Sequence, residues 1–408
     1  MKKRVCVIGG GAAGMMAAGT AILHGADVTI FEHMKMLGKK LAITGKGRCN
    51  VTNACDTRDF ITNITKNARF MFSTLNSFGP YDVMSFFEDA GVPLKVERGN
   101  RVFPVSDKAI DIVNALRHYS ENALVINEKV KRIFLNDNGS FTVHAASEYI
   151  FDSVILATGG RSYPLTGSDG SGYRLATRLG HTATALSPSL VPINSTDPLC
   201  HEMQGLSLKN VGIKIIDENR NTVYSDFGEM MFTHFGVTGP VILSASAHVR
   251  NYDISSLTLS IDLKPALDED TLDKRLLSEF EKNSNKDVIN VMPSLLPSKM
   301  IEPFLAKAGV DERRKVNSIT KQERMALLST LKSFDIQLDS FRPIEEAIIT
   351  SGGIDVKEID PKTMESKLVN GLYFAGEVID VDAYTGGFNL QIAFSTGYSA
   401  GMHAAEIY

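Results

Sequence analysis

The sequence predicts an α/β fold with a parallel sheet, interrupted by an inserted β-barrel-like module and a small helical segment. Three observations support this prediction: a strand–helix–strand unit at the N-terminus, a middle region of short strands followed by amphipathic helices, and glycine-rich strand patterns after residue 342. Because the last region continues the character of the first, we expect the middle to be inserted into one domain.

The N-terminal unit is visible in the apolar pattern. Residues 4–8 (RVCVI) and 27–32 (DVTIFE) are short apolar runs that predict buried strands. Between them, residues 12–24 predict a helix, with Gly25 just past its end. Residues 151–157 (FDSVILA) predict a further buried strand, at which the chain is expected to return to the parallel sheet.

Antiparallel strands are predicted in two places. Residues 126–135 and 140–143 flank an Asn-Asp-Asn-Gly turn and predict a hairpin. From about residue 192 the helical period is absent and short strands alternate with turns, which predicts the β-barrel-like module. The strand-like segments of that module are residues 211–217, 222–225 and 257–262.

Three amphipathic helices are predicted after the β module, because apolar positions recur there at helical spacing between proline-bearing connections. They cover residues 268–281, 297–308 and 321–331. The expected domains are a discontinuous α/β domain of residues 1–191 and 343–408, an inserted β-barrel-like domain of residues 192–265, and an inserted helical segment of residues 266–342.

The composition is that of an ordinary folded protein, since 43% of the residues are hydrophobic and 22% are charged. The 43 Lys and Arg residues are balanced by 47 Asp and Glu residues, and a net charge of −4 gives no general attraction to nucleic acid or anionic lipid. No apolar run approaches the roughly 20 residues of a membrane span. We expect a cytoplasmic protein without nucleic-acid or membrane partners, of unknown oligomeric state.

A glycine motif follows the first predicted strand. The motif Gly9-x-Gly11-x-x-Gly14 lies between that strand and the predicted helix. A strand before the glycines and a helix after them make the motif a more specific sign of dinucleotide binding. Gly9 permits a tight turn, Gly11 lets the backbone approach a pyrophosphate, and Gly14 lets the helix pack on the sheet. Glu32 ends the second strand, where an acid is expected to bind ribose hydroxyls. The sequence therefore predicts a Rossmann-like dinucleotide site.

Two later segments favour FAD over NAD, which the glycine motif alone does not distinguish. Residues 371–380 (GLYFAGEVID) and 386–391 (GGFNLQ) lead into an expected helix, whose N-terminus suits anionic flavin atoms. Asp380 is placed to accept hydrogen bonds from ribityl hydroxyls, and N–H groups near Asn389 and Leu390 suit the pyrimidine end of the flavin. The alternative is that these glycines only shape turns.

These motifs together resemble the two-dinucleotide-binding-domain flavoproteins, and within them the BaiN/YhiN-type family, which includes enzymes described as aminoacetone oxidases. The matching segments are VIGGGAAG at 7–14, TGKGRCNVTN at 44–53, ATGGRSYPLTGSDGSGY at 157–173, GEMMFTHFGVTGP at 228–240, TSGGI at 350–354 and GLYFAGEVIDVDAYTGGFNLQIAFSTG at 371–397. The resemblance implies FAD contacts at Gly11, Ala13, Glu32, Lys40, Arg48, Val130, Thr158, Gly159, Gly376, Asp380, Gly387, Asn389 and Leu390.

Candidates for chemistry are few. His234 and Tyr384 are proposed to face substrate and transfer protons, the alternative for each being a structural hydrogen bond. Arg48 is a candidate for bidentate pairing with a phosphate. Five residues stand between Cys49 and Cys55, a spacing that disulfide reductases do not use, so free thiols are expected. No metal site is expected, because no second His/Cys pair lies at ligand spacing.

The predicted function is that of an FAD-dependent oxidoreductase acting on a small organic substrate. Two directions remain open: NAD(P)H-dependent reduction of a conjugated carbonyl or enone, like a 3-dehydro-bile acid Δ4,6-reductase, or amine oxidation, like an aminoacetone oxidase. Because the chain has no second Gly-x-Gly-x-x-Gly unit, a nicotinamide would have to bind transiently. The alternatives are a flavin-dependent RNA-modifying protein, which the acidic balance disfavours, and a non-catalytic flavin redox sensor.

Overall fold

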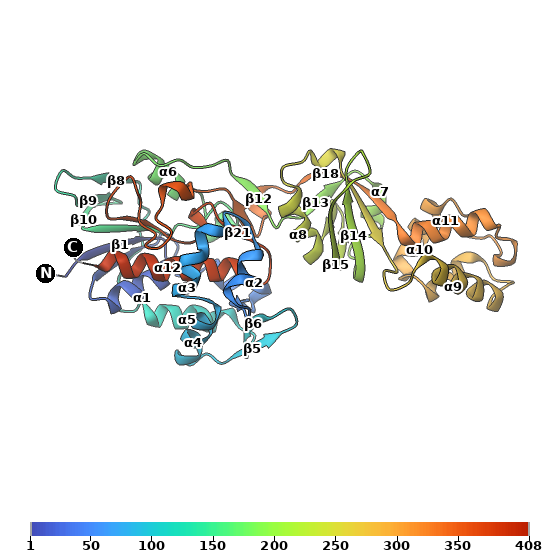
Figure 1. Ribbon diagram of the computed structural model, residues 1–408, viewed down its shortest axis with the longest axis horizontal. Helices are drawn as coiled ribbons and strands as arrows, with labels where there is room; N and C mark the ends of the chain where they lie inside the picture. The colour runs from blue at the N-terminus through green and yellow to red at the C-terminus, as the bar shows by residue number, and fades with distance from the viewer. Residues whose placement is uncertain (1, 407–408) are drawn as a thin grey trace. The chain divides into compact units, whose positions relative to one another are not determined.

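The computed structural model describes residues 2–406 and divides into two compact units (Figure 1). The first, here called the Rossmann unit, comprises Met1–Ser189 and Pro343–Tyr408, and the second, the inserted unit, comprises Leu190–Arg342. These limits lie close to the expected boundaries at residues 191 and 343. The β-barrel and the helices that follow it share the inserted unit, so no division falls at residue 265.

A parallel sheet forms the centre of the Rossmann unit. Its five strands lie in the order β20-β11-β1-β2-β7, and each neighbouring pair is parallel. The strands are β1 (Arg4–Ile8), β2 (Asp27–Phe31), β7 (Leu124–Ile126), β11 (Ser153–Leu156) and β20 (Leu372–Phe374). Every residue of β11 and β20 is buried, as expected for parallel strands covered on both faces. The predicted α/β fold with a C-terminal return to the sheet is confirmed.

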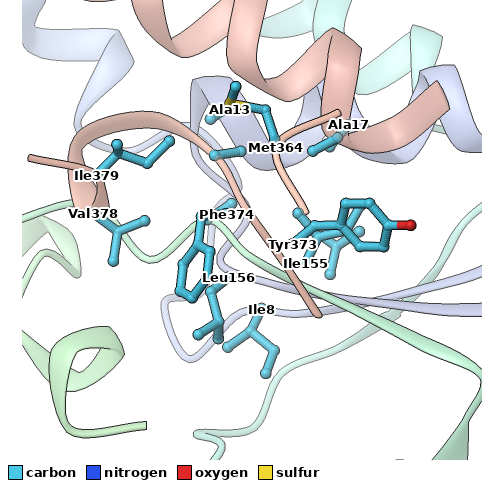
Figure 2. Packing of buried hydrophobic residues seen from close by; sticks show 14 of the residues in the cluster. Ile8, Ala13, Ala17, Ile155, Leu156, Met364, Tyr373, Phe374, Val378 and Ile379 are labelled. Atoms are coloured by element: carbon cyan, nitrogen blue, oxygen red, sulfur yellow. The ribbon is translucent and has the colours of Figure 1, made fainter. Parts of the chain in front are cut away.

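Side chains of the first and last parts of the chain meet in the core beside this sheet. Ile8 is the register partner of Leu156, which is in turn the partner of Phe374, and Figure 2 shows the three side chains together. Helices α1 (Ala12–Leu23) and α12 (Phe388–Ala405) pack closely, because a Cβ on Gly397 would lie 2.5 Å from the Ala13 carbonyl oxygen. Small residues thus let the two helix backbones touch.

Smaller elements complete the Rossmann unit. Antiparallel pairing joins β10-β9-β8, β3-β6-β5, β12-β19 and β21-β4. The strands are β3 (Thr52–Asn53), β4 (Ile64–Lys66), β5 (Leu94–Glu97), β6 (Arg101–Pro104), β8 (Arg132–Leu135), β9 (Phe141–His144), β10 (Glu148–Phe151), β12 (Ser187–Ser189), β19 (Ile349–Ser351) and β21 (Asp382–Ala383). The helices are α2 (Thr57–Thr62), α3 (Phe72–Ser77), α4 (Pro80–Asp89), α5 (Ala109–Tyr119) and α6 (Ser171–Arg178).

The predicted hairpin is correct only in its second half. β8 and β9 pair across the Asn-Asp-Asn-Gly turn, but Ile126 belongs to β7 in the parallel sheet. The single strand predicted over residues 126–135 is therefore two strands of different sheets. Val130 is buried in the irregular stretch between β7 and β8, as Ile133 is within β8, so an apolar residue falls inside the break and hides it.

The inserted unit contains a closed antiparallel barrel in the order β13-β16-β15-β14-β17-β18. Its strands are β13 (Ile193–Ser195), β14 (Ser207–Ile216), β15 (Thr222–Thr233), β16 (Gly236–Thr238), β17 (Thr258–Asp262) and β18 (Phe334–Phe341). The β-barrel-like module is thereby confirmed. One strand, β18, comes from the region expected to be helical and closes the barrel after the helices.

Some helices of the inserted unit were predicted from the sequence, and others were missed. The three amphipathic helices occur where predicted, as α9 (Glu269–Lys282), α10 (Ser298–Ala308) and α11 (Lys321–Lys332). Two more, α7 (Pro198–Glu202) and α8 (Pro240–Val249), lie in the region that was expected to lack helices. The sequence of α8 (PVILSASAHV) has no acidic residue and one basic residue, His248, so it lacks the charged face that would have revealed its period.

Candidate functional site

In the glycine loop between β1 and α1, the fold requires glycine at two positions but not at the third. A Cβ on Gly9 would lie 2.4 Å from the Ala157 carbonyl oxygen, and one on Gly14 would lie 1.9 Å from the Gly9 carbonyl oxygen. A Cβ on Gly11 would meet no atom of the described residues within 4 Å, apart from its neighbours in the chain. Gly11 is also the N-cap of α1, and it has no side chain to bond the first N–H groups of the helix. The open space beside Gly11 therefore lies at a helix N-terminus, which suits a phosphate.

Glu32 stands just beyond β2 and beside the glycine loop. Its Oε2 accepts a hydrogen bond from the Gly10 N–H (2.9 Å), and its Oε1 accepts one from the Met34 N–H (2.8 Å). Each oxygen has a second lone pair, so the carboxylate is held in place and can still accept hydrogen bonds from a diol. Its predicted contact with the ribose stays a prediction.

The N-terminus of α12 forms a second candidate ligand surface. Gly387 caps the helix at φ +97°, and a Cβ there would lie 2.3 Å from the Thr52 carbonyl oxygen. The Asn389 side chain accepts from the Ala383 N–H (2.9 Å) and donates to the Ala383 carbonyl (2.7 Å). Asn389 therefore orders the preceding loop with its side chain, which leaves the main-chain N–H groups of Asn389 and Leu390 in the first helical turn for an anion.

Within residues 2–406, three buried polar atoms near these loops have no hydrogen-bond partner. They are Oδ1 of Asn50, Oγ1 of Thr158 and Oδ1 of Asp380. The Lys66 ammonium lies 2.8 Å from the same Asp380 oxygen, an ion-pair contact outside hydrogen-bonding geometry. Because buried polar groups are costly unless they are hydrogen-bonded, these atoms fit a ligand rich in hydroxyl and amide groups. The ribityl chain and flavin ring of FAD have that chemistry.

Lys40 anchors a polar network that links segments far apart in the sequence. Its ammonium donates to Ser162 Oγ (2.7 Å) and to Glu377 Oε2 (2.6 Å). The other Glu377 oxygen accepts from the Ser162 hydroxyl (2.9 Å) and the Thr350 N–H (2.9 Å). The sequence prediction named Lys40 but missed Glu377, although Glu377 lies inside the GEVID segment. Lys40 thereby holds the loop after β11 beside the residues next to Gly376.

Arg48 has carboxylate partners in the structure. Its guanidinium donates to Glu97 and to Asp107 (2.8 Å from Nε) and lies 4.2 Å from the centre of the Phe103 ring. Hydrogen bonding to Arg48 lowers the pKa of Glu97, and hydrogen bonds from Lys95 and Arg48 lower that of Asp107. Two carboxylates thus already neutralise the cation that was expected to pair with a phosphate, and contact between Arg48 and FAD stays a prediction.

Three further predicted contacts lie around these loops. Ala13 is in the first turn of α1, where its Cβ would be 2.8 Å from a Cβ added at Gly376. Gly159 follows β11 at φ +70°, and a Cβ there would be 2.7 Å from Ser168 Oγ. Val130 is buried in the core of the Rossmann unit and also lines a basic pocket described below. All three remain predictions as FAD contacts.

The family assignment follows from a match over nearly the whole chain. Residues 3–403 match the family model described as the HI0933-like protein Rossmann domain. The chain belongs to this family. The resemblance to BaiN/YhiN-type flavoproteins is thereby confirmed, and together with the FAD-compatible loops it makes the chain an FAD-dependent oxidoreductase.

Two curated relatives of this HI0933-like protein have named activities. The 3-dehydro-bile acid delta(4,6)-reductase of Clostridium scindens is 29% identical over 99% of this chain and 99% of its own. The ribosomal RNA dihydrouridine synthase of Escherichia coli is 30% identical over 96% of each chain. A solved 3-ketosteroid delta1-dehydrogenase from Sterolibacterium denitrificans shares the fold, with a TM-score of 0.53 at 12% identity over 98% of this chain and 99% of that one.

The two proposed proton-transfer residues belong to different units. Tyr384 follows β21 in the Rossmann unit, where its N–H donates to the Asn63 carbonyl (3.0 Å) and its own carbonyl accepts from Asn389 (3.3 Å). His234 is exposed in the turn between β15 and β16 of the inserted unit, with its ring centre 5.0 Å from that of Phe235. The loop bonds fix the Tyr384 backbone beside the N-terminus of α12.

The cysteines are thiols, as expected. All four are buried and free, so Cys49 and Cys55 form no disulfide. Burial raises the pKa of Cys49 to about 12, against a smaller opposing effect of its hydrogen bond with Thr44, and burial raises that of Cys55 to about 11. Within residues 2–406, no cluster of metal-binding side chains occurs, and no helix has the length and apolarity of a membrane span.

Proposed function

We propose that this protein reduces a carbon–carbon double bond conjugated to a carbonyl group, with FAD as the resident cofactor and NAD(P)H as the electron donor. The observation that carries the proposal is the chemistry shared by the two relatives described above. A delta(4,6)-reductase of a 3-dehydro-bile acid and a dihydrouridine synthase both, by name, saturate a double bond conjugated to a carbonyl. This favours reduction over amine oxidation.

The reaction adds a hydride to the β-carbon of the substrate and a proton to its α-carbon, while NAD(P)H becomes NAD(P)+. Bound FAD would supply the hydride-transfer chemistry for this reaction. The chain's part is to bind, orient and supply the proton. In this proposal the first turns of α1 and α12 hold anionic groups, Asp380 accepts hydrogen bonds from hydroxyls, and Tyr384 donates the proton.

Tyr384 is favoured as the proton donor over His234 because its loop is tied to the start of α12 through Asn389. Replacing Tyr384 with Phe is expected to lower kcat by about 100-fold or more, the usual effect of losing a general acid. FAD absorbance and substrate KM should change little, and His234→Gln serves as the comparison. An unchanged kcat in Tyr384→Phe would remove Tyr384 from the proposal.

A second candidate function is the reduction of uridine in ribosomal RNA. The relative with that name is as similar to this chain as the bile acid reductase is, at 30% against 29% identity. The two candidates share the reaction and differ in substrate size. The acidic net charge of −4 favours the small substrate, since RNA binding relies on cations that meet phosphates.

The test is a turnover assay with three substrates in parallel: a 3-oxo-Δ4,6 bile acid, a uridine-containing ribosomal RNA fragment, and aminoacetone. Purified FAD-loaded protein is supplied with NADPH or NADH, and products are analysed by mass spectrometry. A product heavier by two hydrogens in either of the first two arms supports the proposal, and the arm identifies the substrate. Consumption of aminoacetone with oxygen, and no saturation of a double bond, would replace the proposal with an oxidase.

A further inference from the structure

A basic pocket of about 300 Å³ lies in the Rossmann unit. Lys129 and Lys131 line it from the chain segment before β8, and Ser171, Arg174 and Arg178 line it from α6. Because residues three, four and seven apart share one face of a helix, α6 presents its serine and both arginines on the same side. The pocket thus gathers four cationic side chains in a chain whose net charge is −4.

Most of this positive charge is uncompensated. Lys129 pairs with Asp169, and the Arg178 guanidinium donates to the Lys131 carbonyl oxygen (3.1 Å). In the part of the chain that the structure describes, no carboxylate lies within ion-pair distance of the side chains of Lys131, Arg174 or Arg178. Cations that gather without partners repel one another, so the arrangement favours an anionic ligand.

The pocket also has an apolar part. Val130 and Leu175 line it between the cations, and they are 5% and 3% exposed. Ligand sites combine an apolar surface with a few converging polar groups. A ligand that joins a phosphate to a less polar portion, as a nucleotide does, matches both features.

We infer that this pocket binds a nucleotide through a terminal phosphate, and specifically the adenosine 2′-phosphate of NADPH. A terminal phosphate has up to two negative charges and three free oxygens, so it can meet cations that converge from two chain segments. A phosphodiester has one charge and continues on both sides, which suits a strip of cations better than a pocket. Arginine is the residue that accommodates the 2′-phosphate in nucleotide sites. The inference rests on the proposed use of a nicotinamide donor.

Equilibrium binding is the first test. The FAD-loaded protein is titrated calorimetrically with 2′,5′-ADP, which carries the 2′-phosphate, and with 5′-AMP, which does not. We expect 2′,5′-ADP to bind at least about tenfold more tightly, and Lys131→Gln and Arg174→Gln each to weaken its binding about tenfold, the usual effect of losing one charge-assisted hydrogen bond. Arg132→Gln is the matched control, because Arg132 is exposed next to Lys131 but does not line the pocket.

Equal weakening by all three substitutions, or no preference for 2′,5′-ADP over 5′-AMP, would overturn the inference. So would failure of 2′,5′-ADP to bind while a short single-stranded RNA binds and loses affinity in Lys131→Gln and Arg174→Gln, since the pocket would then serve a phosphodiester. Retained FAD absorbance and thermal unfolding midpoints establish that the variants are folded. The three substituted side chains are all exposed, so they should fold normally.

A kinetic measurement separates this inference from the proposed function. The wild-type flavin should be bleached faster by NADPH than by NADH, and Arg174→Gln should remove that preference. If both nucleotides bleach the flavin equally and no pocket variant matters, the inference fails while the proposed reductase stands. If 2′,5′-ADP binding depends on the pocket but neither nucleotide bleaches the flavin, the pocket stands as a nucleotide site and the proposed function fails.

Discussion

The three glycines of the first loop are not equivalent, because different atoms surround each of them. Gly9 and Gly14 are required by backbone atoms of the chain itself, whereas the space beside Gly11 contains no protein atom within 4 Å. The sequence motif already assigns a tight turn to Gly9, close approach of a pyrophosphate to Gly11 and helix packing to Gly14. The structure divides them into two residues that build the turn and one that leaves room for a ligand.

A pair of substitutions tests this division. Gly11→Ala is expected to leave the unfolding free energy of the FAD-free protein within about 1 kcal/mol of wild type, because the new methyl group meets no atom and the remaining cost is that Ala is a poorer N-cap than Gly. It should weaken FAD binding, because the methyl group enters the space beside the helix N-terminus. Gly14→Ala should instead destabilise the fold itself. Flavin fluorescence titration and urea unfolding measure the two effects, and equal stability loss in both variants would contradict the division.

The thiols give a second prediction about single residues. Because all four cysteines are buried and the pKa of Cys49 is raised to about 12, the native protein should not react with a disulfide reagent at pH 8, and four thiols should react after unfolding in guanidinium. The unfolded thiols ionise near their ordinary pKa of about 9, so stability should fall as pH rises above that value. One rapidly reacting thiol in the native protein would contradict the buried arrangement.

Elements of secondary structure were predicted well where one local pattern determines them. β1, α1, β2 and the three amphipathic helices of the inserted unit lie within a residue or two of their predicted bounds. Elements without such a pattern were missed. Helix α8 lacks a charged face, and the strand predicted from residue 126 crosses two sheets because the buried Val130 continues its apolar pattern.

The polar contacts between elements were beyond sequence reasoning. Asp382 is fully buried and accepts hydrogen bonds from the hydroxyls of Thr65 (2.8 Å), Ser189 (3.0 Å) and Ser351 (2.9 Å), which come from three other strands or loops. Lys40 and Glu377 are separated by 337 positions. No spacing rule connects such residues, because their proximity depends on how the whole sheet is ordered.

The hydrogen bonds of Lys40 give a prediction about how elements far apart in the sequence are held together. Lys40→Met removes the ammonium and leaves the mostly buried carboxylate of Glu377 with fewer donors, so the free energy of unfolding should fall by about 1–3 kcal/mol. Lys35→Met is the control, since Lys35 is exposed in the same loop, and should change it by less than about 0.5 kcal/mol. Urea unfolding measures both. Similar small changes in the two variants would show that the network does not hold the loops together.

For the whole molecule, the composition correctly indicated an ordinary folded protein, but it did not reveal where charged residues cluster. A net charge of −4 argues against a broad basic surface, yet four cationic residues line one pocket of the Rossmann unit. The fold class, the family and FAD-dependent redox chemistry were predictable because their motifs are local and numerous. The substrate could not be predicted in this way, because one fold and one cofactor serve many reactions.

In the proposed reaction, electrons from reduced flavin saturate a conjugated double bond. The most direct test is a single turnover without oxygen: FAD-loaded protein is reduced until the flavin band near ~450 nm is bleached, and then mixed with the enone or uridine substrate. The band should return, and one double bond should be saturated for each flavin reoxidised. A band that stays bleached with both substrates and returns only on admission of oxygen would contradict the proposed reaction.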